Sequence, residues 1–217
     1  MEGVYASRAV AGRALGAALA RDGQTSSAMV LGLPRGGVPV AAEVAAALGA
    51  ALDVLVVRKL GVPGHEELAM GAVAAGGVRV LDQRVVREAG VDGEAIADVT
   101  RRGREEVDRQ ETAFRGDRPP LAPQAARAIV VDDGLATGST MRAAVRALRA
   151  MAAATIVVAV PVGSAQAVES LRDEADAVVC PWVPEPFVAV GAWYERFEPV
   201  SEDEVRALLA RLPAHGA

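Results

Sequence analysis

Cysteine, aromatic residues, long apolar runs and excess positive charge are all scarce in this chain of 217 residues. The single cysteine, Cys180, excludes an internal disulfide framework and is typical of a reducing compartment, so we expect a cytoplasmic protein. No apolar run reaches the roughly 18 residues that a membrane span requires, so no membrane partner is expected. The net charge of −5 disfavours broad phosphate neutralisation, so no nucleic-acid partner is expected. Aromatic residues make up only 3% of the chain, and we therefore expect an aliphatic core.

Short apolar segments typical of strands alternate with segments typical of helices. The expected strands are 28–33, 53–57, 127–131, 155–160 and 177–180, and the expected helices include 10–20, 38–48, 139–151, 165–174 and 202–212. Near-continuous Val and Ile runs between helices indicate a parallel sheet covered on both faces, an α/β doubly wound fold. Ligands of such sheets lie beyond the carboxyl ends of the strands, where residues 34–37, 58–59 and 132–140 fall.

Residues 60–124 interrupt this alternation. Their first part is glycine-rich with short β-like pieces, and residues 93–115 form a highly charged helix. The charge run is most simply a solvated helix face carrying i,i+4 ion pairs. The tail, 181–217, holds most of the aromatic residues.

The segment 129–140, I-V-V-D-D-G-L-A-T-G-S-T, carries the strongest functional pattern. A buried strand delivers two adjacent carboxylates, Asp132 and Asp133, to the rim of the sheet. The small, glycine-rich loop that follows lets backbone N–H groups converge on an anion at a helix N-terminus. Carboxylates beside a phosphate site suit a sugar phosphate, because ribose hydroxyls donate to the carboxylates while the loop takes the phosphate.

This segment resembles the phosphoribosyl pyrophosphate (PRPP) signature of the type I phosphoribosyltransferases. The resemblance implies one phosphoribosyltransferase domain over 1–217, with a core at about 27–180, an insertion at about 60–124 and a small hood from about 1–26 and 181–217. It also implies Mg²⁺, PRPP and a homodimer. Asp132 and Asp133 would be catalytic and would hold the metal mainly through ribose hydroxyls or water. The 5′-phosphate would be bound by Gly134, Leu135, Ala136, Thr137, Gly138, Ser139 and Thr140.

Two further segments match the places where this family binds pyrophosphate. Arg35, Gly36 and Gly37 follow the first core strand, although such a segment alone could be a simple turn. Arg58 and Lys59 end the expected strand 53–57 and open a glycine-containing stretch, 61–77, which resembles the flexible catalytic loop of the family. Cations there would stabilise the departing pyrophosphate, and Arg35 and Lys59 are therefore catalytic candidates. The alternative for Arg58 and Lys59 is a surface pair at a strand end.

The tail segment 187–195 loosely resembles the base-binding segment of the 6-oxopurine enzymes. Trp182, Phe187 and Val188 are the base-binding candidates, although aromatic residues near a C-terminus more often close a core. One departure concerns Ala136, which stands where the 6-oxopurine branch carries an Asp.

A group that handles a proton, if the reaction requires one, must then come from elsewhere. Glu66, Glu67 and His65 are candidates, each with a simple surface role as the alternative. Cys180 is expected to pack as a small hydrophobic residue.

The leading functional hypothesis is a phosphoribosyltransferase that displaces pyrophosphate from PRPP with a nitrogenous base. The alternative is a non-catalytic protein that senses PRPP or nucleotides, and a third possibility is transfer to an acceptor other than a base. The sequence defines the donor better than the acceptor.

Overall fold

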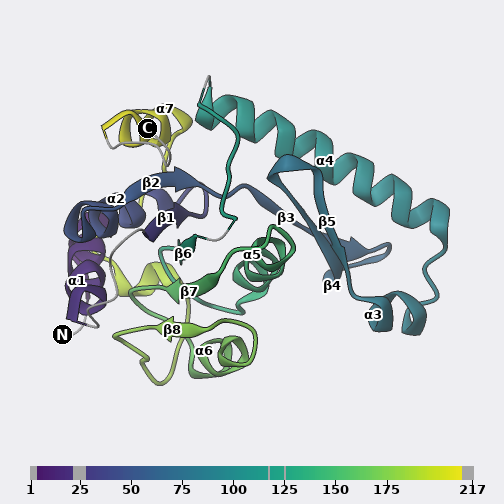
Figure 1. Ribbon diagram of the computed structural model, residues 1–217. Helices are drawn as coiled ribbons and strands as arrows, with labels where there is room; N and C mark the ends of the chain where they lie inside the picture. The colour runs from purple at the N-terminus through teal and green to yellow at the C-terminus, as the bar shows by residue number, and fades with distance from the viewer. Residues whose placement is uncertain (1–3, 22–27, 117, 125, 212–217) are drawn as a thin grey trace.

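In the part of the chain that the computed structural model describes, residues 4–21, 28–116, 118–124 and 126–211, five parallel strands form the central sheet (Figure 1). Their order across the sheet is β2-β1-β6-β7-β8. The strands are β1 (Ala28–Gly32), β2 (Ala51–Val54), β6 (Arg127–Val131), β7 (Thr155–Ala159) and β8 (Ala177–Val179). This arrangement confirms the predicted α/β fold with a parallel sheet. Residues 27 and 125 of the expected core, residue 117 of the expected insertion, and residues 1–3, 22–26 and 212–217 of the expected hood lie outside the described residues.

Successive residues of a strand point to opposite faces of the sheet. Because these strands are mostly apolar, both faces are apolar and helices cover both. Val30 and Ile129 enter one core with α1 (Arg8–Arg21), α2 (Gly37–Leu48) and α7 (Glu202–Arg211). Their neighbours Leu31 and Val130 enter the other core with α5 (Ser139–Ala150) and α6 (Ala165–Arg172). The expected strands and helices of this core therefore end within one or two residues of the observed ones, apart from the strand expected at 53–57.

A second, antiparallel sheet is built from the first part of the insertion. It contains β3 (Val57–Val62), β4 (His65–Ala74) and β5 (Val78–Leu81), with a short 3₁₀ turn, η1 (Ala75–Gly77), between the last two. After α3 (Gln83–Glu88), the long helix α4 (Gly93–Arg115) crosses this sheet (Figure 1). The helix approaches closely at Gly103, where an added Cβ would lie 2.9 Å from side-chain carbons of Leu60 and Val73.

The strand expected at 53–57 is wrong, because this apolar run belongs to two strands of different sheets. β2 ends at Val54 and β3 begins at Val57, and the chain crosses between them through Leu55 and Val56, which are both buried. Hydropathy alone does not reveal this break, since every residue from Val54 to Val57 is apolar. As a consequence, Arg58 and Lys59 lie within β3 rather than at a strand end, and the stretch 61–77 is mostly a β-hairpin rather than a loop.

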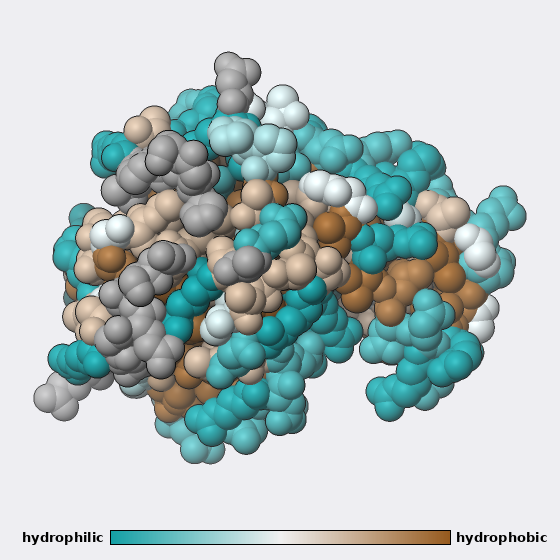
Figure 2. Space-filling view, in the orientation of Figure 1, coloured by the Kyte–Doolittle hydropathy of each residue, from teal (hydrophilic) through white to brown (hydrophobic). Residues whose placement is uncertain are grey.

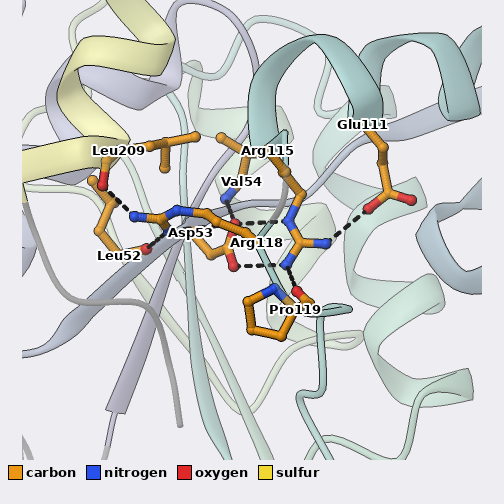
Figure 3. Close-up of polar contacts among 8 residues, drawn as sticks. All are labelled: Leu52, Asp53, Val54, Glu111, Arg115, Arg118, Pro119 and Leu209. Carbon is orange, nitrogen blue, oxygen red and sulfur yellow. Dashed lines mark hydrogen bonds and ion pairs between the residues drawn. The ribbon is translucent and has the colours of Figure 1, made fainter. Parts of the chain in front are cut away.

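A buried ion-pair network fastens the end of α4 to the edge strand β2 (Figure 3). Arg115 donates from Nε and Nη2 to the two carboxylate oxygens of Asp53, at 3.0 Å each. Arg118 donates to the carbonyl oxygen of Leu52 at 2.9 Å and to that of Leu209 in α7. Asp53 and Arg115 are only 3% and 9% exposed, so the network joins insertion, sheet and C-terminal helix within the protein interior.

The hydropathy of the molecular surface differs between α4 and the second sheet. Figure 2 shows hydrophilic residues along the outer side of α4, and apolar residues below it over the second sheet, where Leu68 is 49% exposed. None of the described helices combines the length and the apolar character that crossing a membrane requires.

Candidate functional site

Two adjacent carboxylates follow β6 at the carboxyl edge of the central sheet. Asp132 Oδ1 accepts the backbone N–H of Asp133 at 2.8 Å, and Asp133 Oδ2 accepts Nε of Arg8 at 2.8 Å. No other residue that the structure describes donates to Asp132 Oδ2 or Asp133 Oδ1. Each carboxylate therefore keeps one oxygen available as an acceptor, which suits a ligand with two neighbouring hydroxyl donors.

The protein environment of these carboxylates disfavours double ionisation. Burial raises the pKa of Asp132 well above its usual range, and the negative charge of Asp133 raises it further. Burial also raises the pKa of Asp133, while the hydrogen bond and the positive charge of Arg8 oppose that rise. Hydroxyl donors from a ligand would favour the ionised form of both groups, because they supply hydrogen bonds that the protein does not.

Arg8, in the first turn of α1, has all of its guanidinium groups engaged. Nε and Nη2 both lie 2.8 Å from Asp133 Oδ2, and Nη1 donates to the carbonyl oxygen of Glu198 at 2.8 Å. The guanidinium carbon lies 3.8 Å from the centre of the Phe197 ring, in cation–π contact. Segments near the two ends of the chain therefore meet at Asp133.

Tyr194 supports the same aspartate from the tail of the chain. Its hydroxyl donates to the backbone carbonyl oxygen of Asp133 at 2.5 Å, and its ring stacks on Phe197 with centroids 5.0 Å apart. Burial and the nearby charge of Asp133 raise the pKa of Tyr194, so the phenol remains protonated and able to donate. The hood residues Arg8 and Tyr194 thus hold the side chain and the backbone of Asp133.

The loop after the carboxylates leads into the N-terminus of α5. The backbone N–H groups of Ala136, Thr137 and Gly138 have no hydrogen-bond acceptor among the described residues. Gly138 has a φ of +75°, a left-handed conformation that glycine adopts readily, and it turns the chain into the helix. The hydroxyls of Thr137 and Ser139 lie 3.2 Å apart, and Thr140 is exposed beside them. Unpaired amides and hydroxyl donors at a helix N-terminus form an anion site.

Two residues of this loop have structural partners. The amide of Leu135 donates to the carbonyl oxygen of Val162 at 2.9 Å, and its side chain is buried, so neither group is available to a ligand. Gly134 lies under the tail, since an added Cβ would be 2.5 Å from Cγ1 of Val190. The lack of a side chain at Gly134 therefore lets the tail segment approach the anion site.

The turn 34–37 lies directly against the two carboxylates. The Pro34–Arg35 peptide bond is cis, and the Arg35 side chain is exposed. An added Cβ at Gly36 would lie 2.2 Å from Asp133 Oδ2, and one at Gly37 would lie 2.8 Å from Cα of Asp132. The absence of side chains at both positions allows this turn to approach the carboxylates.

Arg58 and Lys59 line a different cavity from that turn. The cavity of about 570 Å³ lies between the β3–β4 hairpin, α4 and the start of α5, and Arg102 and Thr140 contribute to its wall. Arg35 is not among its lining residues. Lys59 Nζ lies 2.9 Å from Glu67 Oε2. Thr140, at the start of α5, also lines this cavity, so the cavity of these two cations borders the anion loop.

The candidates for proton handling lie at the tip of the same hairpin. His65, Glu66 and Glu67 are all exposed. Glu67 pairs with Lys59, and Glu66 accepts the backbone N–H of Gly64 at 3.3 Å. The structure gives no contact between these three residues and the carboxylates after β6.

The base-binding candidates belong to an aromatic cluster in the hood. Trp182 and Trp193 pack edge to face with centroids 4.6 Å apart, and Phe187 lies 6.3 Å from Trp193. Val188 is 77% exposed, which leaves it free of packing. The cluster adjoins the carboxylate site, because Trp193 precedes the tyrosine that bonds to Asp133.

Cys180 lies next to this cluster and packs against the second core. Its thiol lies 3.2 Å from the carbonyl oxygen of Trp182. Burial raises the pKa of Cys180 to about 11, so the thiol is neutral near pH 7. This environment agrees with the expected packing role.

Sequence reasoning missed three residues at these sites: Arg8, Tyr194 and Arg102. Arg8 carried one available signal, because a cation in the first turn of a helix opposes the helix dipole and needs another reason to be there. Tyr194 and Arg102 carry no local signal, since their contacts come from segments distant in the sequence.

Within the described residues, no group of three or more His, Cys, Asp or Glu side chains could enclose a metal ion. A cation at Asp132 and Asp133 would therefore need most of its ligands from a substrate or from water. Mg²⁺ is commonly held in this way, through one or two carboxylates and substrate phosphates.

Comparison with known proteins agrees with this geometry. Residues 6–195 match the family described as the phosphoribosyl transferase domain. Two relatives from Mycobacterium tuberculosis, strains H37Rv and CDC 1551, are each named "Putative phosphoribosyl transferase" and are 47% identical to the chain over 208 residues. These alignments cover 96% of the chain but 47% of each relative, so the chain spans about half the length of these curated relatives.

A solved structure resembles the chain over nearly its whole length. The protein TT1426 from Thermus thermophilus superposes with a TM-score of 0.90 at 42% identity, covering 96% of this chain and 99% of that one. The signature after β6, the parallel sheet and the family match over residues 6–195 lead to one conclusion: the chain belongs to the type I phosphoribosyltransferase family.

Proposed function

We propose that this chain is a Mg²⁺-dependent phosphoribosyltransferase, which uses PRPP and displaces pyrophosphate from C1 of the ribose with a nitrogenous base. One observation carries the proposal. Two carboxylate oxygens, Asp132 Oδ2 and Asp133 Oδ1, are open beside a loop of unpaired amides at a helix N-terminus. Ribose hydroxyls would donate to the carboxylates, and the 5′-phosphate would accept from Ala136, Thr137 and Gly138.

The reaction would break the bond between C1 and the diphosphate oxygen and form a bond between C1 and a nitrogen of the acceptor. The leaving diphosphate carries away the electron pair, and the proton of the attacking nitrogen passes to a base or to water. Asp132 and Asp133 lie where they would stabilise positive charge developing on the ribose. Arg35, exposed in the turn beside Gly36 and Gly37, would stabilise the leaving group, with Arg58 and Lys59 as further cations.

Mg²⁺ would be held by diphosphate and ribose oxygens, with Asp132 and Asp133 acting mainly through ribose hydroxyls or water. The donor set fits this role, since the two open oxygens are hard ligands and the described residues supply no complete cage of their own. The ion would neutralise charge on the departing diphosphate.

The acceptor is the least defined part of the proposal. Trp182 and Phe187 both pack against Trp193, the chain neighbour of Tyr194, and a planar base would stack on this aromatic cluster, with Val188 at its rim. Ala136 provides no carboxylate for a purine nitrogen. We also propose the homodimer that the family resemblance implies, which sedimentation of the purified protein would measure.

A non-catalytic sensor of PRPP or nucleotides is the second candidate. One observation favours it: Arg58 and Lys59 line a cavity to which Arg35 does not contribute, and a sensor needs PRPP binding but no cations gathered around a leaving group. Transfer to an acceptor other than a base is the third.

The first experiment measures pyrophosphate release from PRPP and Mg²⁺ with adenine, hypoxanthine, guanine, xanthine, uracil, orotate, nicotinate or no acceptor. Release that depends on one base supports the transferase and identifies the acceptor. PRPP binding in calorimetry without release for any base would favour the sensor or an unusual acceptor. No PRPP binding would contradict the assignment of Asp132–Thr140.

A variant test addresses the ribose role. The double variant Asp132→Asn/Asp133→Asn is expected to abolish turnover and weaken PRPP binding while the protein still folds, because the substitutions keep shape but remove charge. The matched control is Asp203→Asn/Glu204→Gln, an adjacent acidic pair at the exposed start of α7. Unchanged turnover in the first variant would refute the ribose assignment.

A further inference from the structure

In the described part of the hood, the guanidinium group of Arg8 is held on three sides. Arg8 is held by Asp133 through Nε and Nη2, by the carbonyl oxygen of Glu198 through Nη1, and by the face of the Phe197 ring. Its side chain is 12% exposed and that of Asp133 is 14% exposed. Both partners are thus fixed in position and largely shielded from water, so the pair is screened far less than a surface pair.

The other arginine of the same helix that pairs with a carboxylate provides a contrast. Arg13 lies 3.4 Å from Glu43, with side chains 58% and 32% exposed. A pair of that kind contributes little and fixes no geometry. Arg8 also occupies the first helical turn, where the helix dipole disfavours a cation. Its position is therefore explained by its contact with Asp133 rather than by the stability of α1.

The contact with Arg8 determines which oxygen of Asp133 is left for a ligand. Both donors of Arg8 converge on Oδ2, and Gly36 leaves room for that oxygen because an added Cβ would lie 2.2 Å away. Oδ1 is then the oxygen left for a ligand. Arg8 also offsets one of two neighbouring negative charges at a site that must accept an anionic sugar phosphate.

We propose that Arg8 is a positioning residue for the sugar-phosphate donor: it holds Asp133 Oδ2 so that Oδ1 faces the ribose, and it compensates the charge of Asp133. This inference rests on the proposed function, since it concerns the PRPP-binding carboxylates. The role proposed for Arg8 links the binding of the sugar phosphate to the hood, because Arg8, Phe197 and Glu198 all belong to the terminal segments.

The test is a double-mutant cycle that follows PRPP binding by calorimetry in the presence of Mg²⁺. Arg8→Met, which keeps the apolar stem and removes the guanidinium, is expected to weaken PRPP binding about 10- to 100-fold. Arg8→Lys is expected to lose less, because it retains the charge but not the two-donor fork. In the Asp133→Asn background, Arg8→Met is expected to cost less than about threefold, since its effect acts through Asp133.

Arg13→Met is the matched control, expected to bind PRPP as the wild type does. Thermal melting of every variant separates loss of binding from loss of folding, and binding is measured well below each midpoint. Equal or tighter binding by Arg8→Met, or losses that simply add in the cycle, would overturn the inference while leaving the proposed function intact. Failure of the wild type to bind PRPP would instead overturn the proposed function, and the role of Arg8 with it.

Discussion

Because Gly36 lies close to Asp133, adding a single methyl group at Gly36 should displace the Asp133 carboxylate. In Gly36→Ala the new Cβ would lie 2.2 Å from Asp133 Oδ2 and 2.9 Å from its Cγ, whereas real Cβ contacts under 3.0 Å are essentially never seen. Gly36 has φ −61° and ψ −34°, which alanine adopts without strain. The backbone therefore stays in place and the carboxylate must move, by about 1 Å on van der Waals grounds.

A shift of that size breaks the fixed geometry between Asp133 and the 2.8 Å donors of Arg8. Hydrogen bonds to charged groups contribute about 1.5–3 kcal/mol, which corresponds to a loss of about 10- to 150-fold in PRPP affinity. The free energy of unfolding should also fall, by about 0.5–2.5 kcal/mol, because the weakened contact with Arg8 outweighs the roughly 0.4–1 kcal/mol that alanine contributes by reducing the conformational entropy of the unfolded chain.

Calorimetric titration with PRPP and Mg²⁺, together with urea denaturation, measures both quantities. Gly93→Ala is the control, since an added Cβ at that first residue of α4 has no atom within 4 Å. PRPP affinity equal to that of the wild type in Gly36→Ala would refute the idea that the position of Asp133 matters for donor binding. A large loss of stability would show that the turn, rather than the carboxylate, had moved.

Two predictions concern other parts of the fold. Asp53→Ala removes the more buried of the two counter-ions of Arg115 and leaves Glu111, 3.2 Å from Nη1, so we expect the free energy of unfolding to fall by up to about 3 kcal/mol in urea denaturation; a loss below about 1 kcal/mol would contradict the assigned burial. Because burial raises the pKa of Cys180 to about 11, little thiolate exists at pH 8, and iodoacetamide should react about 200-fold more slowly than with a free thiol. Denaturant should remove this protection, and rapid alkylation of the folded protein would show that Cys180 is not buried.

The parts of the fold that the sequence predicts are those specified locally. The strand 127–131 and the helix 93–115 occur with the expected bounds, because the first is a β-branched run before an acidic turn and the second lies between Asp92 and Gly116. Asp92 accepts the N–H of Ala95 and caps that helix. Such signals need no knowledge of the rest of the chain.

What the sequence does not predict depends on distant contacts. The run through Leu55 and Val56 contains no polar residue to mark the change from one sheet to the other. The site is divided in the same way: Asp132 and Asp133 follow from the signature, whereas Arg8 reaches them across 125 positions in the chain. Pairing at that separation is decided by the packing of the hood.

The ion-pair network at the end of α4 also determines how the insertion can move relative to the core. The 23 residues of α4 form a rod of about 34 Å whose C-terminal end is anchored at Asp53 and whose middle and far end carry the second sheet. A tilt of about 5° about that anchor would displace the other end by about 3 Å, on the scale of a hydrogen bond, and the contact of the second sheet with α5 would have to accommodate it. Arg102 lies about 20 Å along the helix from Arg115, so the same tilt would move it by about 1.7 Å, and the wall that it contributes to the cavity of Arg58 and Lys59 is sensitive to small rotations at that anchor.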